Sequence, residues 1–353
     1  MDTRTTRSAC RPVERATPVS PIPVAAIIAI LTAAALVLAG PPGPSSIWEP
    51  DPAHSDEFDG NTLDGGKWLD YHPYWSGRSP SRYHTDNVSV RDGNLCLRSG
   101  VANANMQGDW VSAACVTSRD RDCLYGYYYE ARFKASRLSM TSSFWFQGSG
   151  REIDVTESTG ASVDAPELDW IMQFNTHTGG RSNDVTTLKY YEMSSRSSDD
   201  YHTYAMWWRN PRSIWVYCDN EKRGEVDLSA DFDGSQYMFF DTETFSYLGM
   251  PTLESLYDES ANTMYVDWVR TWKFLGDEDD VAVERQGARP IPTESLTPMR
   301  SLAGSPPPLF TLAGRLVPSH RVSPDAAGRA RPNASGMFVV RGAGGCTEAL
   351  MRR

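Results

Sequence analysis

The chain has 353 residues, among them 11 Trp, 16 Tyr and 12 Phe, and its formal net charge at pH 7 is -11. Residues 1–45 carry a net charge of +2 and residues 281–353 a net charge of +6, which leaves -19 for residues 46–280. A segment this acidic argues against nucleic acid as a partner, because phosphate backbones repel it. The aromatic residues suffice to fill a large core and also to line a binding surface.

The N-terminal segment has the pattern of an export signal. Residues 24–40 form an apolar run with a single Thr, four arginines precede it, and "GPPGPSS" follows. A spanning helix needs about 20 apolar residues, so the run is slightly short for one. We therefore expect residues 1–45 to be a signal peptide with a short linker and the protein to be secreted. The long basic region before the run leaves an uncleaved membrane anchor as the alternative.

Residues 46–276 read as an all-β domain. Alternating runs surround Asp92-Gly93 and Asp219-Asn220, which are hairpin signals. Residues 125–134, "YGYYYEARFK", place apolar and charged side chains on opposite faces of a strand. Residues 264–274 alternate in the same way, and no helical stripe is present. This pattern predicts a sandwich of two antiparallel sheets.

Two further features concern the tail and the cysteines. Residues 277–353 are rich in Pro, Arg, Gly, Ala and Ser and have no Lys, which predicts a disordered tail. Of the six cysteines, four lie in the all-β segment, where export would permit disulfides. No Cys-x-x-Cys and no Cys/His pair has the spacing of a zinc site, so the sequence predicts no metal cluster.

The stretch "GREIDVTES" holds three acids, Glu152, Asp154 and Glu157. A regular strand would place Glu152 and Asp154 on one face and would turn Glu157, five residues from Glu152, to the other. One extra residue near Val155-Thr156, a β-bulge, would return Glu157 to the face of the other two. Carboxyl groups packed this closely raise one another's pKa, which suits hydrolysis of a glycosidic bond by one nucleophile and one protonated acid.

The acidic stretch resembles the E-x-D-x-x-E signature of glycoside hydrolase family 16 in its bulged form. Further ordered motifs resemble the family between residues 56 and 274: "DEFDG", "YGYYYEARFK", "YHTYAMWWR" and "MYVDWVRTWK". The resemblance implies a jelly-roll β-sandwich with a concave substrate cleft. It also implies that Glu152 is the nucleophile and Glu157 the general acid/base, with Asp154 between them to tune the nucleophile.

Within the family, the agarase, porphyranase and carrageenase branch is the most similar. "WLDYHPYWSGR" resembles its aromatic entry segment and contributes Trp75, and "SSFWFQ" places Trp145 seven residues before Glu152. "YMFFDTETF" and "NTHTGG" resemble strands that supply Glu243 and His177. These four residues are the expected substrate-binding residues. A sulfated galactan would also need cations, and Arg78 and Arg181 are candidates.

Other roles are open for several of these residues. Trp145 could pack in the core, His177 could make a structural hydrogen bond, and Glu243 could pair with an arginine. Glu57 and Asp267 could belong to the structural calcium site that some family members carry. No cofactor is otherwise expected, and no catalytic metal.

The sequence therefore predicts a retaining endo-glycoside hydrolase that acts as a monomer on a β-linked galactan such as agarose, porphyran or carrageenan. A transglycosylase or a β-glucanase of the same family is the alternative. A carbohydrate-binding protein without catalysis is another, although a pure binder has no need of three repelling carboxylates. The identity of the polysaccharide and its sulfation stay open.

Overall fold

The structure is a computed structural model, and it describes residues 40–178, 185–276 and four short strands between residues 323 and 350. Residues 24–39 of the predicted signal or anchor lie outside the described residues, as does most of the predicted disordered tail. The domain boundaries and the secretion of the protein therefore stay predictions. In the described ranges, no helix is long and apolar enough to cross a membrane.

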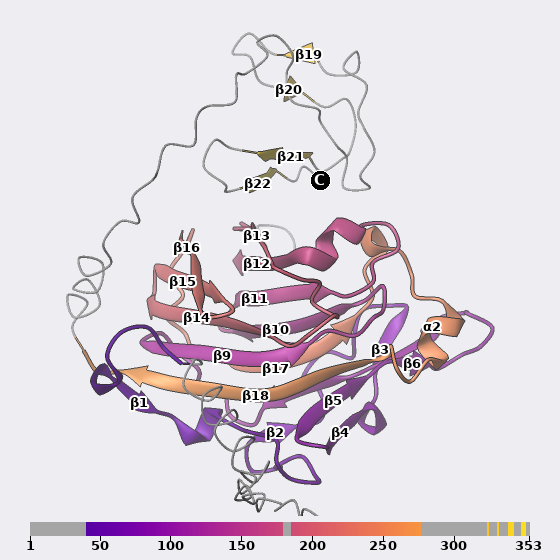
Figure 1. Ribbon diagram of the computed structural model, residues 1–353, viewed down its shortest axis with the longest axis horizontal. Helices are drawn as coiled ribbons and strands as arrows, with labels where there is room; N and C mark the ends of the chain where they lie inside the picture. The colour runs from indigo at the N-terminus through magenta and orange to yellow at the C-terminus, as the bar shows by residue number, and fades with distance from the viewer. Residues whose placement is uncertain are drawn as a thin grey trace, which may run out of the picture. The chain divides into compact units, whose positions relative to one another are not determined.

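Two large antiparallel sheets form the body of the protein (Figure 1). The first has eight strands, of which β1 (Trp48–Pro50) pairs only with β18. The other seven follow one another in the order β16 (Glu221–Asp227), β15 (Ser213–Cys218), β14 (His202–Asn210), β9 (Tyr127–Lys134), β18 (Thr263–Phe274), β5 (Asn94–Arg98) and β4 (Val88–Arg91).

The second sheet has nine strands and carries the acidic stretch on β11. Its order is β2 (Trp68–Leu69), β8 (Cys115–Ser118), β17 (Tyr237–Glu243), β10 (Thr141–Gly148), β11 (Arg151–Thr159), β12 (Ile171–Thr178), β13 (Lys189–Glu192), β22 (Thr347–Leu350) and β21 (Phe338–Arg341). The predicted two-sheet sandwich is confirmed.

Smaller elements lie outside the two large sheets. A three-stranded sheet joins β3 (Ser81–Tyr83), β7 (Val111–Ala113) and β6 (Gly100–Val101), and β19 (Ser323–Pro324) pairs with β20 (Ala330–Arg331). Helix α2 (Leu253–Tyr257) begins with a capping box between Thr252 and Ser255. The short 3₁₀ helices are η1 (Ser45–Ile47), η2 (Pro52–His54), η3 (Thr85–Asn87), η4 (Pro166–Trp170) and η5 (Ser246–Leu248).

The turns that the sequence predicts are present. Asp92 and Gly93 both have positive φ, at 53° and 70°, and connect β4 to β5. Asp219 and Asn220, at 51° and 63°, connect β15 to β16 in the same way. Two consecutive residues with positive φ are characteristic of the type I′ turn, whose twist matches that of the flanking strands.

The alternation of each strand separates a common core from the two outer faces. Tyr129, Ala131 and Phe133 of β9 are buried in the main core, as predicted for one face of "YGYYYEARFK". From the other sheet, Phe146 of β10 packs against Tyr129 with ring centroids 4.9 Å apart and an interplanar angle of 59°. The apolar faces of both sheets therefore meet, and the acids of β11 are left on the opposite face.

The cysteines contribute to the buried interior as free thiols. Cys96, Cys115, Cys123 and Cys218 are all buried and unpaired, so the disulfides that export would permit do not form among the described cysteines. Buried free cysteine behaves as a small apolar side chain.

We expect Phe144→Ala to lower the free energy of unfolding by about 3–5 kcal/mol, because it leaves a cavity where a fully buried ring packs. Urea unfolding followed by tryptophan fluorescence measures this change. Tyr257→Ala is the matched control, since Tyr257 is 64% exposed, and should cost less than about 0.5 kcal/mol. Equal losses for the two variants would contradict this assignment of the core.

Candidate active site

The predicted β-bulge is present in β11. Strands β10 and β11 pair in antiparallel register, with Phe144 opposite Thr156 and Trp145 opposite Asp154. Phe144 and Trp145 are consecutive in β10, but their partners Thr156 and Asp154 are separated by Val155 in β11. Val155 is therefore the extra residue, and it is fully buried.

The bulge brings the three acids onto one face of the nine-stranded sheet. Glu152 lies opposite Gln147 and Glu157 lies opposite Ser143. The residues opposite the three acids on β10 are Gln147, Trp145 and Ser143, which are spaced by two. The side chains of the three acids therefore project from the same face. We call this the polar face. Ile153 and Val155 project into the core instead, where neither is exposed.

The neighbouring strands add more titratable side chains to the polar face. On β12, His177 lies opposite Glu152 and Asn175 opposite Asp154. On β17, Glu243 lies opposite Thr141 and Asp241 opposite Ser143, which places both acids on the same face. The structure thus brings together the acids of β11, His177 and Glu243 on one face, and their catalytic and substrate-binding roles stay predictions.

Glu152 has a neighbour on each side that can orient its carboxylate. The Gln147 side-chain amide donates a hydrogen bond to Glu152 Oε2. His177 Nε2 lies 3.9 Å from Glu152 Oε1 and 3.6 Å from Asp154 Oδ2, and 2.9 Å from Asn175 Nδ2. Of the three acids of β11, Glu152 and Asp154 each have a carboxylate oxygen within 4 Å of His177 Nε2.

The electrostatic environment favours protonated carboxyl groups on this face. Burial raises the pKa of Glu157 to about 7, aided by the negative charges of Glu243 and Glu152 and opposed by His177 and Arg78. Burial and the charge of Glu152 also hold the pKa of Asp154 well above its usual range. At neutral pH, Glu157 is therefore able either to donate or to accept a proton, as a general acid/base must.

Glu243 belongs to a hydrogen-bonded network that the sequence reasoning did not foresee. Tyr83 donates to Glu243 Oε1 at 2.8 Å and is also within hydrogen-bonding distance of Asp241. Arg78 Nε donates to Glu243 Oε2 at 2.8 Å, and its guanidinium lies 4.1 Å from the centroid of the Phe245 ring. Glu243 therefore pairs with an arginine, which was the alternative role. The sequence could have indicated Asp241, because it lies two residues before Glu243 and so on the same face of the strand. The position of Tyr83 depends on a separate small sheet.

Aromatic side chains of the entry segment, β10 and β17 gather around a buried histidine of the entry segment, His72. Its ring stacks on Phe239 at 4.7 Å and on Trp145 at 5.8 Å, and contacts Trp75 edge-on at 5.8 Å. Burial lowers the pKa of His72 to about 4, so it is neutral at neutral pH. Trp145 projects from the polar face but is only 6% exposed, beneath His72 and against Phe239. Trp75 is half-buried.

The remaining candidates are engaged elsewhere or lie outside the described residues. Glu57 accepts two hydrogen bonds from Arg270, both at 2.8 Å, and Asp267 pairs with Arg132. The structural calcium that these two acids suggested stays a prediction. Arg181 falls in residues 179–184, which the structure does not describe.

Comparison with known sequences assigns this domain to a family. The family described as β-porphyranase A-D, GH16 domain, matches residues 48–274. β-Porphyranase E of Zobellia galactanivorans is 32% identical over 249 residues, covering 65% of this chain and 88% of that protein. β-Porphyranase B of Phocaeicola plebeius is 30% identical over 278 residues, covering 66% and 86%.

Solved structures are similar over the same part of the chain. A β-porphyranase from the human gut bacterium Bacteroides plebeius has 29% identity and a TM-score of 0.60, covering 66% of this chain and 94% of that one. β-Agarase A from Zobellia galactanivorans has a TM-score of 0.59 at 20% identity, covering 64% and 92%, which supports the fold alone.

Glu243→Gln should lower the pKa of Glu157, because it removes the neighbouring charge that contributes most to raising it. The basic limb of the pH profile of kcat/KM, which reports the acid form of the free enzyme, should then move to lower pH. Glu254→Gln, an exposed acid on α2, is the control and should leave the limb in place. An unchanged limb in Glu243→Gln would contradict this electrostatic coupling.

Proposed function

Because the chain belongs to the β-porphyranase group of glycoside hydrolase family 16, and is thus a glycoside hydrolase, we propose that it cleaves a β-linked galactan internally with retention of configuration. The observation that carries the proposal is the bulge at Val155, which gathers Glu152, Asp154 and Glu157 on one face. Retaining glycosidases need two carboxyl groups of opposite protonation state on the same side of the substrate.

In the proposed mechanism, the Glu152 carboxylate attacks the anomeric carbon while Glu157 gives its proton to the departing glycosidic oxygen. A covalent glycosyl-enzyme forms, and Glu157, now ionised, takes a proton from the water that releases the sugar. The pKa of about 7 suits Glu157 to both steps. Gln147 orients the attacking carboxylate, and burial raises the pKa of Asp154, which disfavours a second negative charge beside it.

Substrate binding in this proposal uses the aromatic and charged groups around the acids. Trp75 offers an apolar surface for a pyranose ring, whose C–H face stacks on aromatic planes. Trp145, whose ring stacks on His72 and Phe239, supports this aromatic group through the contact of His72 with Trp75. In this proposal His177 and Glu243 hydrogen-bond hydroxyl groups near the cleaved bond, a role supported by their positions on the polar face with the three acids. The sequence relatives named above are β-porphyranases, which supports a red-algal type of galactan.

Arg78 favours a sulfated galactan over a neutral one. Its side chain is 46% exposed although Nε is bonded to Glu243, so part of the guanidinium faces solvent beside the acids. A planar guanidinium binds sulfate oxygens through paired hydrogen bonds. We therefore propose a porphyran-type substrate, with Arg78 as a contact to the sulfate.

Glu152→Gln should reduce kcat on porphyran by about 10⁴-fold or more, since the amide cannot form the covalent intermediate. Release of reducing ends measures the loss, and circular dichroism checks that the fold is retained. Glu259→Gln, an exposed acid, is the matched control and should behave as the parent. With the parent enzyme, NMR of the first product should show the β-anomer. Full activity of Glu152→Gln, or an α-anomer first, would overturn the mechanism.

Arg78→Gln should lower kcat/KM on the sulfated polysaccharide by at least about tenfold more than on its desulfated form, because a hydrogen bond to a charged group contributes about 1.5–3 kcal/mol. Arg82→Gln is the control, since Arg82 is an exposed arginine four residues further along the chain that pairs with Asp109 instead of Glu243. If Arg78→Gln reduced kcat/KM equally on the sulfated and desulfated polysaccharides, Arg78 would stabilise the neighbouring carboxylates and would not bind a sulfate.

A further inference from the structure

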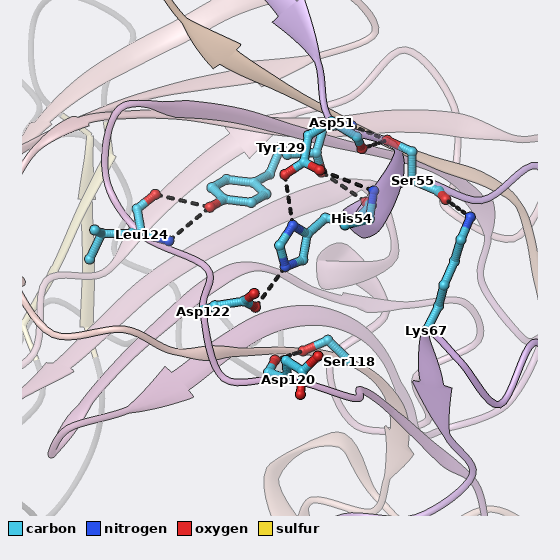
Figure 2. A network of polar contacts seen from close by, with 11 residues as sticks. Asp51, His54, Ser55, Lys67, Ser118, Asp120, Asp122, Leu124 and Tyr129 are labelled. Carbon is cyan, nitrogen blue, oxygen red and sulfur yellow. Dashed lines mark hydrogen bonds and ion pairs between the residues drawn. The ribbon is translucent and has the colours of Figure 1, made fainter.

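A second polar cluster joins η2 to the segment that follows β8 (Figure 2). His54 is at its centre, with Nδ1 2.7 Å from Asp51 Oδ2 and Nε2 2.8 Å from Asp122 Oδ1. Cys123 follows Asp122 in the chain, and its side chain is a buried free thiol. One ligating atom each of His54, Asp122 and Cys123 lie within 4.8 Å of one another.

We propose that His54, Asp122 and Cys123 form a binding site for one Zn²⁺ ion. The donors are an imidazole nitrogen, a carboxylate oxygen and a thiolate sulfur, the three kinds of ligand that zinc takes in proteins. A thiolate favours zinc over the hard cations calcium and magnesium, which prefer all-oxygen sites. None of the three residues has a part in the reaction proposed above.

Asp51 completes the arrangement around the histidine. A zinc-bound imidazole nearly always donates its second ring N–H to a carboxylate or carbonyl, which fixes the ring and makes the ligating nitrogen more basic. The Asp51 carboxylate is in this position at Nδ1. Nε2, on the opposite side of the ring, then faces Asp122 and is the atom available to the metal.

The site needs only a small adjustment to admit the ion. Ligand atoms of a tetrahedral zinc site are about 3.4 Å apart, from bond lengths of about 2.0–2.3 Å. Asp122 Oδ1 is 2.8 Å from Nε2, and its side chain is 57% exposed, so it can withdraw by the required fraction of an ångström. Coordination would form one bond each to nitrogen, oxygen and sulfur. The thiol proton of Cys123 and the proton between Nε2 and Asp122 would leave to solvent.

The backbone around the cluster is held in place by other contacts. Thr271 of β18 donates a hydrogen bond to the His54 carbonyl at 2.9 Å. The Tyr129 hydroxyl bonds both the amide and the carbonyl of Leu124, each at 2.9 Å (Figure 2). Cys123 forms an antiparallel bridge with Gln236. A metal site gains affinity when its ligands are positioned in advance in this way.

Gln236 provides an independent observation at the same place. Its side chain is fully buried, and neither the carboxamide oxygen nor the nitrogen has a hydrogen-bond partner in the described ranges. Residues paired across an antiparallel bridge project from the same face, so this carboxamide lies beside the Cys123 side chain. Buried polar atoms without partners are costly. A zinc-bound thiolate would accept from the Gln236 nitrogen, or the oxygen would take the fourth coordination position.

The test uses the full chain freed of metal with a chelator and then titrated with Zn²⁺ or Co²⁺. It is done in a His177→Gln background, because Glu152, Asp154 and His177 also lie close enough together to hold an ion. We expect one metal per chain by elemental analysis. With Co²⁺, a thiolate-to-cobalt charge-transfer band should appear in the near ultraviolet.

The band should disappear in Cys123→Ser and persist in Cys96→Ser, which removes another buried free thiol. Asp51→Asn should weaken zinc binding by about 10–100-fold without removing the band, as expected for a group that orients a ligand. Asp122→Asn changes an exposed side chain and keeps the test valid if Cys123→Ser fails to fold. It should also weaken binding, and zinc should raise the thermal midpoint of the background chain more than that of this variant.

Three results would overturn the proposal. The His177→Gln chain could bind no zinc after removal of the chelator. His54 would then only hydrogen-bond the carboxylates of Asp51 and Asp122. Zinc could bind equally tightly to Cys123→Ser or to Asp122→Asn. The cobalt complex could also lack a thiolate band. None of these results would bear on the proposed glycosidase, whose activity is measured separately.

Discussion

The extra residue Val155 in β11 is the constraint on which the candidate active site depends. Side chains alternate strictly along a strand, so an odd separation puts two residues on opposite faces unless the register is broken. The bulge absorbs Val155 into the core, and Glu157 returns to the face of Glu152. In a regular strand, Glu157 would project into the core, on the opposite face from Glu152 and Asp154. With Val155 as the extra residue, all three carboxyl groups lie on one face.

This clustering determines the charge state of the site. The carboxyl groups of β11 and β17 share one face that is closed from behind by the core, so burial and mutual repulsion raise the pKa of Asp154, Glu157 and Asp241. The cation Arg78, which donates a hydrogen bond to Glu243, offsets part of this repulsion. The result is a face that can hold one carboxylate and one protonated carboxyl group side by side, which is the requirement of double displacement.

Strand parity and turn chemistry made much of the fold predictable. The hairpins at Asp92-Gly93 and Asp219-Asn220 and the two-sheet sandwich follow from local alternation and positive-φ turns. The bulge was predictable because the acids would otherwise be divided. The substrate side of the site was less predictable. Trp145 lies on the polar face but is largely covered by His72 of the entry segment, a contact that the spacing of Trp145 from Glu152 does not indicate.

The sequence by itself determined which side chains share a face within each strand, because that property depends only on the two-residue period and the position of the extra residue. It also carried the family resemblance. Tertiary structure alone decided which strands lie side by side, and so joined Tyr83 and Arg78 to Glu243 from more than 150 positions away. It likewise brought His54 to Asp122, 68 residues apart, a cluster that no local spacing indicates. Pairing between strands distant in sequence is fixed by burial of the common core, and a single sequence does not encode it as a local pattern.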